Sequence, residues 1–358
     1  MRTAEFDYDL PPELIAQAPT ARRDQSRLLV LNRLKRSLEH RRLRDFVAYL
    51  QAGDVVVLNN SRVIPARLRG VKTESGGQIE VLLTEELAVN DWWVMLRPGK
   101  RVRMGTTIEF RAPSQRLSEF TATIKAKNED GLCRLQFTGV PDVRDTLDWL
   151  GEMPLPPYIE RSSAESPVND RERYQTVFAR EPGSVAAPTA GLHFTPELLA
   201  EIRQRGVRVC FVTLHVGLGT FAPVKAECVE HHRMHEEPFD LPAETARTIQ
   251  QAKHAGHRVF AVGTTTLRVL ETAAARHGGA IGPCRGRTAL FVYPPYEFNV
   301  VDALLTNFHL PKSTLLMLVS AFAAPGETRG RELVLSAYAE AIRERYRFYS
   351  YGDAMVLL

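Results

Sequence analysis

The chain has 358 residues, of which 44% are hydrophobic and 25% are charged, the composition of an ordinary globular protein. That composition excludes disordered, fibrous and strongly acidic proteins, and the length favours two domains. The 46 Lys and Arg residues and the 42 Asp and Glu residues give a net charge of only +4, so charge alone does not establish nucleic-acid binding. Most of the cationic residues are arginine, whose planar side chain suits contacts with phosphate.

The pattern of strands changes near residue 60. Before it, the apolar runs Leu28-Leu29-Val30-Leu31 and Val55-Val56-Val57-Leu58 are typical of buried strands. After it, short strand-like runs alternate with turn signals such as Gly76-Gly77 and Pro98-Gly99. The expected strands cover residues 78–83, 92–96, 106–110, 120–125 and 132–137. Short strands at this spacing, with little helical periodicity, predict a small closed β-barrel over residues 60–152.

After about residue 185, strand and helix patterns alternate. The expected strands are 208–214, 259–262, 290–293 and 303–305, and the expected helices are 196–205, 243–255, 267–276 and 314–322. A last helix should bury one face, because apolar residues recur at helical spacing: Val334, Tyr338, Ala341 and Ile342. This alternation predicts an α/β domain, with a mostly parallel sheet covered by helices on both faces, from residues 1–59 and 153–358. The β-barrel is then an insertion into that domain.

The chain has the features of a cytoplasmic protein. Its longest apolar run, residues 314–325, is too short to span a bilayer, and residues 1–9 are acidic rather than apolar. Four cysteines are scattered without a CxxC pair: Cys133, Cys210, Cys228 and Cys284. We therefore expect neither a disulfide framework nor a zinc site of known spacing, and we expect a reducing compartment.

Four loops that follow expected strands share a composition of small residues, hydroxyls and often histidine. They cover residues 188–195, 215–221, 263–266 and 306–314. Ligands of open α/β sheets bind outside the carboxyl ends of the strands, so these loops are the expected ligand site. Gly and Thr at a helix N-terminus bind anions, histidine moves protons near neutral pH, and Phe194, Phe221 and Phe308 offer faces on which a base can stack. The alternative is that the hydroxyls cap helices and the phenylalanines belong to the core.

Three other segments have both a functional and a structural interpretation. His231-His232-Arg233-Met234-His235-Glu236-Glu237 resembles a metal site, but Pro238 ends any helix, so a hydrogen-bonded turn is favoured and no metal is expected. The tail, Tyr346-Arg347-Phe348-Tyr349-Ser350-Tyr351-Gly352-Asp353, has the interleaved aromatic and cationic residues of an RNA-stacking surface, or is a terminal strand with Phe348 in the core. The barrel has a basic character that fits either a phosphate-tracking face or a solvated surface, from Arg62, Arg67, Arg69, Arg97, Lys100, Arg101 and Arg103.

Many motifs along the chain match those of one family. The most specific are Tyr174-Gln175-Thr176-Val177, Ala186-Ala187-Pro188-Thr189-Ala190-Gly191-Leu192-His193-Phe194, Thr213-Leu214-His215-Val216-Gly217, Thr306-Asn307-Phe308-His309-Leu310-Pro311-Lys312-Ser313-Thr314 and Tyr346-Arg347-Phe348. In these motifs the chain resembles the S-adenosylmethionine:tRNA ribosyltransferase-isomerases of queuosine biosynthesis. The resemblance implies an α/β domain with an inserted β-barrel. It also implies an enzyme that transfers and isomerises the ribosyl portion of S-adenosylmethionine onto 7-aminomethyl-7-deazaguanine at the wobble position of tRNA, giving epoxyqueuosine, adenine and methionine.

The implied reaction assigns expected roles to residues of the four loops and the basic surface. A sulfonium stabilises an adjacent carbanion and leaves readily, so no metal or redox cofactor is required, and S-adenosylmethionine is a cosubstrate. The candidates for proton transfer are His193, His215 and His309. The candidates for cosubstrate binding are Thr189, Gly191, Gly217, Gly219, Thr264, Thr265 and Asp302. Among these, the threonines are expected to hold the carboxylate of the methionine portion, and Asp302, Asp9 or Asp353 is expected to pair with the ammonium of that portion. The candidates for tRNA phosphates are Arg62, Arg67, Lys312 and Arg347.

Two other classes of protein remain open on the residues themselves. One is an RNA-binding module without catalysis, in which the barrel and tail bind tRNA and the sheet is a scaffold. The other is a conventional methyltransferase on an α/β sheet, which is disfavoured because its early glycine-rich turn and following acidic residue are not evident. No Walker loop, GxSxG elbow or GxGxxG turn is present in the sequence. The protein is expected to act as a monomer.

Overall fold

The computed structural model describes residues 1–99, 102–114, 117–129, 131–161, 169–217 and 224–358. Contacts divide the chain into two units. The larger comprises Met1–Arg62, Pro156–Glu181 and Ala187–Leu358, and the smaller comprises Val63–Leu155 and Pro182–Ala186. The segment Pro182–Ala186 therefore groups with the smaller unit, although the sequence pattern assigned it to the α/β domain.

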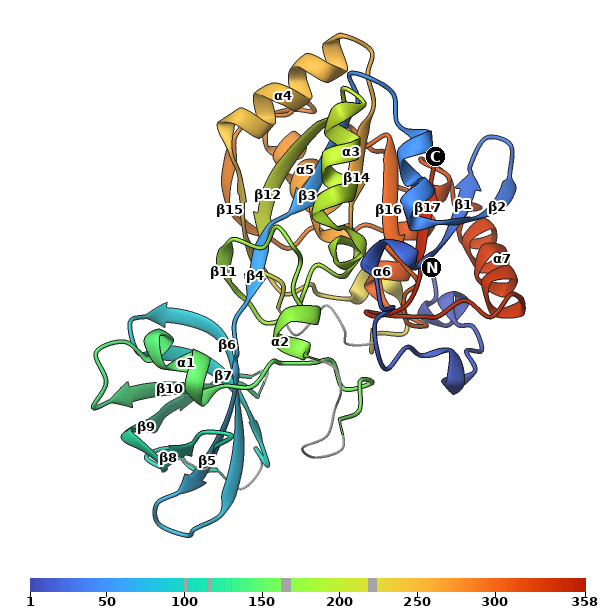
Figure 1. Ribbon diagram of the computed structural model, residues 1–358. Coiled ribbons are helices and arrows are strands. Elements are labelled where there is room, and N and C mark those ends of the chain that lie inside the picture. Colours follow the sequence, from blue (N-terminus) through green and yellow to red (C-terminus); the bar gives the residue numbers. More distant parts are fainter. Residues whose placement is uncertain (100–101, 115–116, 130, 162–168, 218–223) are drawn as a thin grey trace. The chain divides into compact units, whose positions relative to one another are not determined.

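The larger unit is built on a sheet that has nine strands in the described part of the chain (Figure 1). Its strands, in spatial order, are β15 (Cys284–Thr288), β13 (Glu237–Leu241), β12 (Arg208–Leu214), β3 (Val55–Asn59), β14 (Val259–Val262), β16 (Ala303–Asn307), β17 (Ala354–Leu357), β1 (Arg27–Asn32) and β2 (Ser37–Arg42). The apolar run Val55–Leu58 lies at the centre of this order, in β3, where both faces of the sheet are covered, whereas the run Leu28–Leu31 lies in β1, beside the edge strand β2. The α/β class is therefore confirmed.

The four strands β12, β3, β14 and β16 run parallel. Val56 of β3 pairs with Val209 on one side and Phe260 on the other. Among the described strands, the sheet is otherwise mixed, because β13, β15 and β2 pair antiparallel and β17 is antiparallel to β16 but parallel to β1. The expectation of a mostly parallel sheet therefore holds only for its centre. The carboxyl ends of the four central strands consequently meet at one edge.

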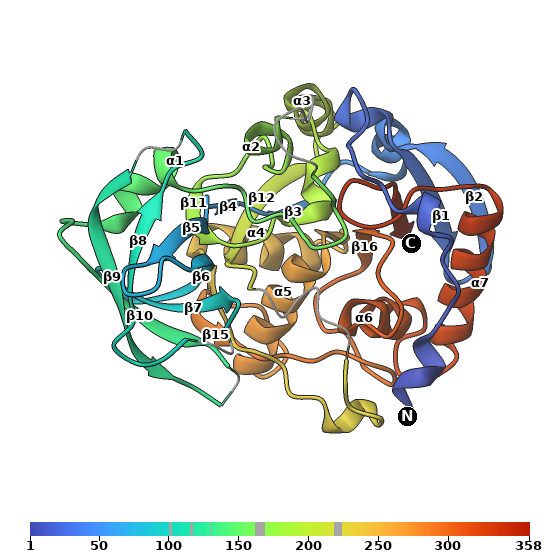
Figure 2. The same cartoon turned by 90° about the horizontal axis from the view of Figure 1, so that it is seen from below.

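Helices cover both faces of this sheet (Figure 2). In both views α3 (Pro196–Gln204) and α5 (Thr264–Arg276) lie on opposite sides of β3 and β12. The remaining longer helices are α4 (Ala243–His254), α6 (Thr314–Ala323) and α7 (Gly330–Arg343). These positions confirm the expected helices, and α7 buries Val334, Tyr338 and Ala341 as expected, whereas Ile342 is only half-buried. No described helix is long and apolar enough to cross a membrane.

The core of the larger unit follows the alternation of its strands. Val56 and Leu58 of β3 point to the same side as Phe260 and Val262 of β14, and this side packs against Phe194 and the apolar stripe of α3. The alternate residues, Val55 and Val57, are also fully buried and face the opposite layer. A strand that is apolar at every position thus becomes the middle of a three-layer structure.

The expected strand at residues 290–293 is wrong. The strand of this region is β15, Cys284–Thr288, which pairs antiparallel with β13 at the edge of the sheet. Its sequence, Cys-Arg-Gly-Arg-Thr, carries two arginines on its more exposed side and offers little apolar signal. An edge strand needs only one buried face, so the composition of residues 284–288 indicated a strand less strongly than the apolar residues 290–293 that follow them.

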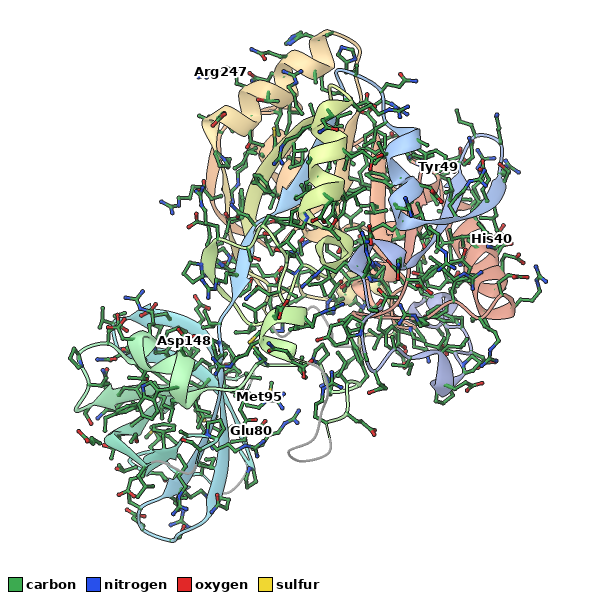
Figure 3. The ribbon with its side chains drawn as sticks, viewed as in Figure 1. His40, Tyr49, Glu80, Met95, Asp148 and Arg247 are labelled. Atoms are coloured by element: carbon green, nitrogen blue, oxygen red, sulfur yellow. The ribbon has the colours of Figure 1, made fainter. Side chains whose placement is uncertain are left out.

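The smaller unit contains a closed barrel, as predicted. Its strands, in spatial order, are β10 (Cys133–Thr138), β7 (Asp91–Arg97), β6 (Gln78–Ala88), β5 (Arg67–Lys72), β8 (Thr107–Arg111) and β9 (Leu117–Lys127). Phe110 and Phe137 stack inside it with ring centroids 5.4 Å apart. Figure 3 shows Glu80 and Met95 on the adjacent strands β6 and β7. The sequence pattern missed β5, because arginine alternates there with the buried Leu68 and the close-packed Gly70.

Short elements complete the description. β4 (Ser61–Val63) and β11 (Glu181–Ser184) form a separate two-stranded sheet. The single-turn helices are α1 (Leu147–Leu150) and α2 (Asp170–Arg173), and a 3-10 turn, η6, covers Thr189–His193. In the tail, Tyr346 and Phe348 are fully buried, so the expectation that Phe348 lies in the core is confirmed and these aromatic residues do not form a stacking surface. The expected terminal strand does not cover residues 346–353 but begins after them, at Ala354. The tail leads into β17.

Candidate functional site

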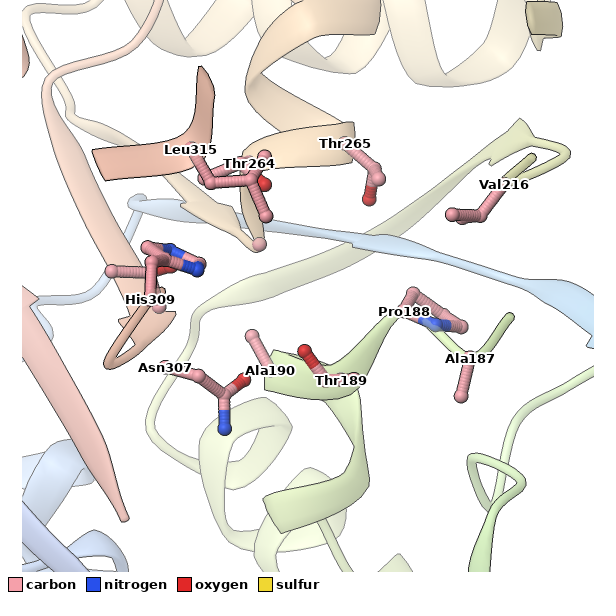
Figure 4. Close-up of a pocket in the computed structure, with 12 residues that line it drawn as sticks. Ala187, Pro188, Thr189, Ala190, Val216, Thr264, Thr265, Asn307, His309 and Leu315 are labelled. Carbon is pink, nitrogen blue, oxygen red and sulfur yellow. The ribbon is translucent and has the colours of Figure 1, made fainter. Parts of the chain in front are cut away.

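A pocket lies at the carboxyl edge of the central strands (Figure 4). Its lining in the described chain comes from all four predicted loops: Ala187, Pro188, Thr189, Ala190, Val216, Gly263, Thr264, Thr265, Thr306, Asn307, His309 and Leu315. The structure therefore brings together segments that are far apart in the sequence, as the position of each loop after a strand predicts. Gly219 and Phe221 lie outside the described residues.

The N-terminus of α5 forms one side of the pocket. Gly263 precedes the helix with a φ of +88°, a conformation that favours glycine, and it offers no side chain to cap the helix. Thr264 and Thr265 follow it and line the pocket. The Thr265 hydroxyl accepts a hydrogen bond from Asn59 Nδ2 at 3.2 Å, so its own hydrogen remains able to donate. Backbone N–H groups and hydroxyls at a helix N-terminus suit a carboxylate or a phosphate.

His309 is the one predicted histidine among the described residues that lines the pocket (Figure 4). It follows β16, its backbone N–H donates to the Tyr338 hydroxyl at 2.9 Å, and its Nε2 lies 2.8 Å from Thr306 Oγ1. Burial lowers the pKa of His309 to about 3, because the charged imidazolium would lose its hydration in this position. A neutral imidazole at the pocket wall is able to accept a proton.

His193 does not line the pocket but lies behind it. Its Nδ1 is 2.7 Å from Ser26 Oγ and its Nε2 is 3.2 Å from Asn307 Nδ2. Burial, followed by the charges of Arg347 and Arg23, lowers the pKa of His193 to about 3. The ring is therefore neutral and engaged at both nitrogens, which leaves no nitrogen facing the pocket.

Asn307 lies between His193 and the pocket, and the sequence reasoning did not select it. It is the last residue of β16, it is 2% exposed, and it lines the pocket. Its Nδ2 donates to His193 and to the Tyr349 carbonyl oxygen at 3.2 Å, whereas its buried Oδ1 has no partner in the described part of the chain. Its place directly at the carboxyl end of a predicted strand was the signal that could have identified it.

The turn that contains His215 and Gly217 is held by its neighbours. The His215 N–H donates to the Pro238 carbonyl oxygen at 3.0 Å, and the Gly217 N–H donates to Glu237 Oε1 at 2.9 Å. Burial lowers the pKa of His215. Neither residue is among the described residues that line the pocket, although Val216 between them is.

Like Gly217, the predicted cosubstrate residues Gly191 and Asp302 do not line the pocket, whereas Thr189 does. Gly191 is buried against Thr176 and Phe178, where a Cβ would come within 2.9 Å of each, so its small size serves packing. Asp302 precedes β16 and lies at the amino edge of the sheet, where it accepts from the Val259 N–H at 2.8 Å and pairs with Lys253. The expectation that Asp302 pairs with the methionine ammonium is therefore wrong, because it lies at the opposite edge from the pocket.

The four predicted tRNA contacts have different surroundings. Arg62 is exposed, and Lys312 makes an exposed ion pair with Asp7 at 2.6 Å. Arg67, in the barrel, donates to the Leu155 carbonyl oxygen at 3.1 Å. Arg347 pairs with the buried Asp353 at 3.4 Å, so part of its charge is already neutralised within the fold. Arg62 and Lys312 thus have the surroundings most favourable to a phosphate contact.

The structure gives little support to the idea that the pocket stacks a base on phenylalanine or binds a metal ion. Phe194 and Phe308 are fully buried in the core, so the alternative interpretation of these two residues is confirmed. Within the described residues, no cluster of three or more His, Cys, Asp or Glu side chains could hold a metal ion. The pocket instead offers hydroxyls, one amide oxygen, one imidazole and backbone N–H groups.

Comparisons with known proteins agree over the whole chain. The family model described as queuosine biosynthesis protein matches residues 3–357. Proteins named S-adenosylmethionine:tRNA ribosyltransferase-isomerase from Natranaerobius thermophilus and Desulforamulus reducens are 51% and 48% identical over 358 residues, which is 100% of this chain and 99% and 100% of those proteins. The crystal structure of S-adenosylmethionine tRNA ribosyltransferase from Thermotoga maritima is similar with a TM-score of 0.54 and 40% identity, over 99% of this chain and 100% of that one. The chain belongs to the queuosine biosynthesis protein family.

Proposed function

We propose that this chain transfers the ribosyl portion of S-adenosylmethionine to 7-aminomethyl-7-deazaguanine at the wobble position of tRNA and isomerises it, releasing adenine and methionine and leaving epoxyqueuosine in the tRNA. The observation that carries the proposal is the pocket, because four loops of matching chemistry meet there at the carboxyl edge of the sheet. Relatives that are about half identical over the full length carry the name of this activity.

The pocket supplies groups for both ends of the cosubstrate. The N-terminus of α5, with Thr264 and Thr265, would hold the methionine carboxylate through N–H and hydroxyl donors. Figure 4 places Thr189 and Asn307 on the other side of the pocket, where the nucleoside would lie. An anion at one end and a neutral nucleoside at the other fit the positive helix terminus and the uncharged lining.

Proton transfer is assigned to His309. The reaction removes a proton from the carbon beside the sulfonium and delivers a proton to the departing adenine. A neutral His309 accepts the first proton and, once charged in a buried site, is a strong acid that gives a proton to adenine. The sulfonium itself activates the carbon, so we propose that no metal or redox cofactor takes part.

Labelled cosubstrate tests this function directly. The protein is incubated with tRNA that carries 7-aminomethyl-7-deazaguanine and with S-adenosylmethionine labelled separately on the ribose and on the methyl group. Ribose label in the tRNA with release of adenine is the expected result. Methyl label in the tRNA would identify a methyltransferase, and binding without turnover would identify an RNA-binding module. Action as a monomer in the cytoplasm remains a prediction.

A further inference from the structure

We propose that Asn307 binds the nucleoside half of S-adenosylmethionine through its side-chain oxygen, and that His193 is a positioning residue that fixes the orientation of the Asn307 amide. The inference rests on the proposed function, and it replaces the expectation that His193 transfers a proton. It follows from a chain of hydrogen bonds that leads from Arg23 through Ser26 and His193 to the pocket.

The direction of each hydrogen bond in this chain is determined by chemistry. The Tyr349 carbonyl oxygen only accepts, so the atom of Asn307 that faces it at 3.2 Å must be the amide nitrogen. The second hydrogen of that nitrogen points to His193 Nε2, which must therefore accept. The neutral His193 ring then carries its hydrogen on Nδ1 and donates to Ser26 Oγ, whose hydroxyl donates onward to the Arg23 carbonyl oxygen at 3.0 Å.

The consequence is that Asn307 presents only an acceptor to the pocket. Both amide hydrogens are used behind the wall, and Oδ1 is buried without a partner in the described part of the chain. Figure 4 shows the Asn307 oxygen turned toward the hollow and its nitrogen turned away. A buried carbonyl oxygen without a hydrogen-bond donor destabilises the fold, so this oxygen is suited to receive a donor from a ligand.

The uncharged lining identifies the half of the cosubstrate that supplies this donor. No carboxylate stands among the described lining residues, so an ammonium against Asn307 would be left without a counter-charge. The nucleoside half is neutral and has three donor groups, the adenine amino group and the two ribose hydroxyls. Thr264 and Thr265, which suit the carboxylate, lie across the pocket from Asn307 (Figure 4). The nucleoside is therefore the half that Asn307 meets.

Steady-state kinetics with saturating modified tRNA tests the role of Asn307. We expect Asn307→Ala to raise KM for S-adenosylmethionine about tenfold, because one buried hydrogen bond is lost. The donor is identified with cosubstrates in which the adenine amino group is a carbonyl, or the 2′- or 3′-hydroxyl is a hydrogen. The analogue that lacks the contacted group loses affinity for the wild type but not further for Asn307→Ala. If Asn307→Ala leaves KM unchanged, or weakens every analogue by the same factor, the proposal is overturned.

Two substitutions test His193 without touching Asn307. Gln places an acceptor oxygen near the position of Nε2, whereas Leu fills the space and accepts nothing. We expect His193→Gln to keep KM, kcat and the pH profile near those of the wild type, and His193→Leu to raise KM for S-adenosylmethionine several-fold. A loss of kcat of about a hundredfold or more in His193→Gln, at all pH values, would overturn the positioning role and show that the imidazole moves a proton.

Failure of this inference is distinguishable from failure of the proposed function. Ribose transfer by the wild type establishes the function irrespective of Asn307. Thermal unfolding of each variant shows whether it is folded, and Ser26→Ala provides a further measurement, because it removes the partner of Nδ1 and leaves both Asn307 and the His193 ring in place. A Ser26→Ala enzyme with a raised KM and unchanged kcat supports the proposal, and one with an unchanged KM contradicts it.

Discussion

Glu237 on β13 and Arg268 on α5 form an ion pair in which both side chains are buried, at 6% and 3% exposure. Glu237 also accepts the Gly217 N–H, so the pair ties a pocket loop to the helix whose N-terminus lines the pocket. We expect Arg268→Met to lower the free energy of unfolding by about 3–5 kcal/mol, because it removes the Arg268 guanidinium from the buried Glu237 carboxylate. Urea denaturation measures this loss.

The control for that substitution lies on the neighbouring strand. Arg287 on β15 pairs with Glu236, and the two side chains are 40% and 61% exposed. We expect Arg287→Met to change the free energy of unfolding by less than about 1 kcal/mol, since water and salt screen exposed pairs. Equal losses in Arg287→Met and Arg268→Met would show that burial of the pair has no energetic consequence.

The buried His193 makes stability dependent on pH. The pKa of His193 is about 3 in the folded chain and about 6.5 in the unfolded chain. Below about pH 6.5, His193 therefore binds a proton in the unfolded chain but stays neutral in the folded chain. The free energy of unfolding consequently falls as the pH falls. Between about pH 7 and pH 5, we expect the wild type to lose about 2 kcal/mol more unfolding free energy than His193→Gln. Urea denaturation at both pH values checks this, and equal losses would contradict it.

Apolar periodicity predicted the sheet centre and the helices because these elements bury residues at regular intervals. Val259–Val262 and the helix that follows it were identified for that reason. The barrel was recognisable from the spacing of its turns. Local pattern was insufficient for the edge strand β15 and for the barrel strand β5, because both carry arginines and depend on neighbouring strands for their pairing.

The candidate site was predictable to the extent that it depends on the ends of strands. Thr264, Thr265 and His309 follow strands, and they line the pocket. Asp302 precedes a strand, and the same rule applied strictly would have placed it at the opposite edge. The partners of Gly191 and His193 could not be predicted, because Phe178, Ser26 and Asn307 approach them only in the folded chain.

Salt dependence separates the candidate tRNA contacts. We expect Arg62→Ala to weaken tRNA binding and to reduce the slope of log K against log salt by about one, because one phosphate contact and its released counterion are lost. Lys312→Ala is expected to have the same effect, because Lys312 can leave its exposed ion pair with Asp7 and contact a phosphate instead. Filter binding at several salt concentrations measures the slopes, and an unchanged slope in both variants would exclude them from the RNA interface.

Arg347 is expected to behave differently from Arg62. Its substitution by Ala leaves Asp353 buried at 2% side-chain exposure without its guanidinium partner. Two backbone N–H groups, of Arg27 and Arg347, still donate to that carboxylate. We therefore expect Arg347→Ala to lower the free energy of unfolding by about 1–3 kcal/mol and to change the salt slope little. A slope reduced as far as that of Arg62→Ala, with unchanged stability, would instead place Arg347 on a phosphate.

Adenine release should depend on His309 in its neutral form. Since burial lowers the pKa of His309 to about 3, the ring is neutral throughout the range from about pH 6 to pH 8, and its titration contributes no slope to the rate there. The rate falls only in acid, where the ring is protonated before the reaction begins. We expect His309→Gln to slow single-turnover adenine release by about a hundredfold or more. His254→Gln, on the exposed surface of α4, is the matched control and should leave the rate unchanged. A His309→Gln enzyme that releases adenine at the wild-type rate would remove this histidine from the proton transfers.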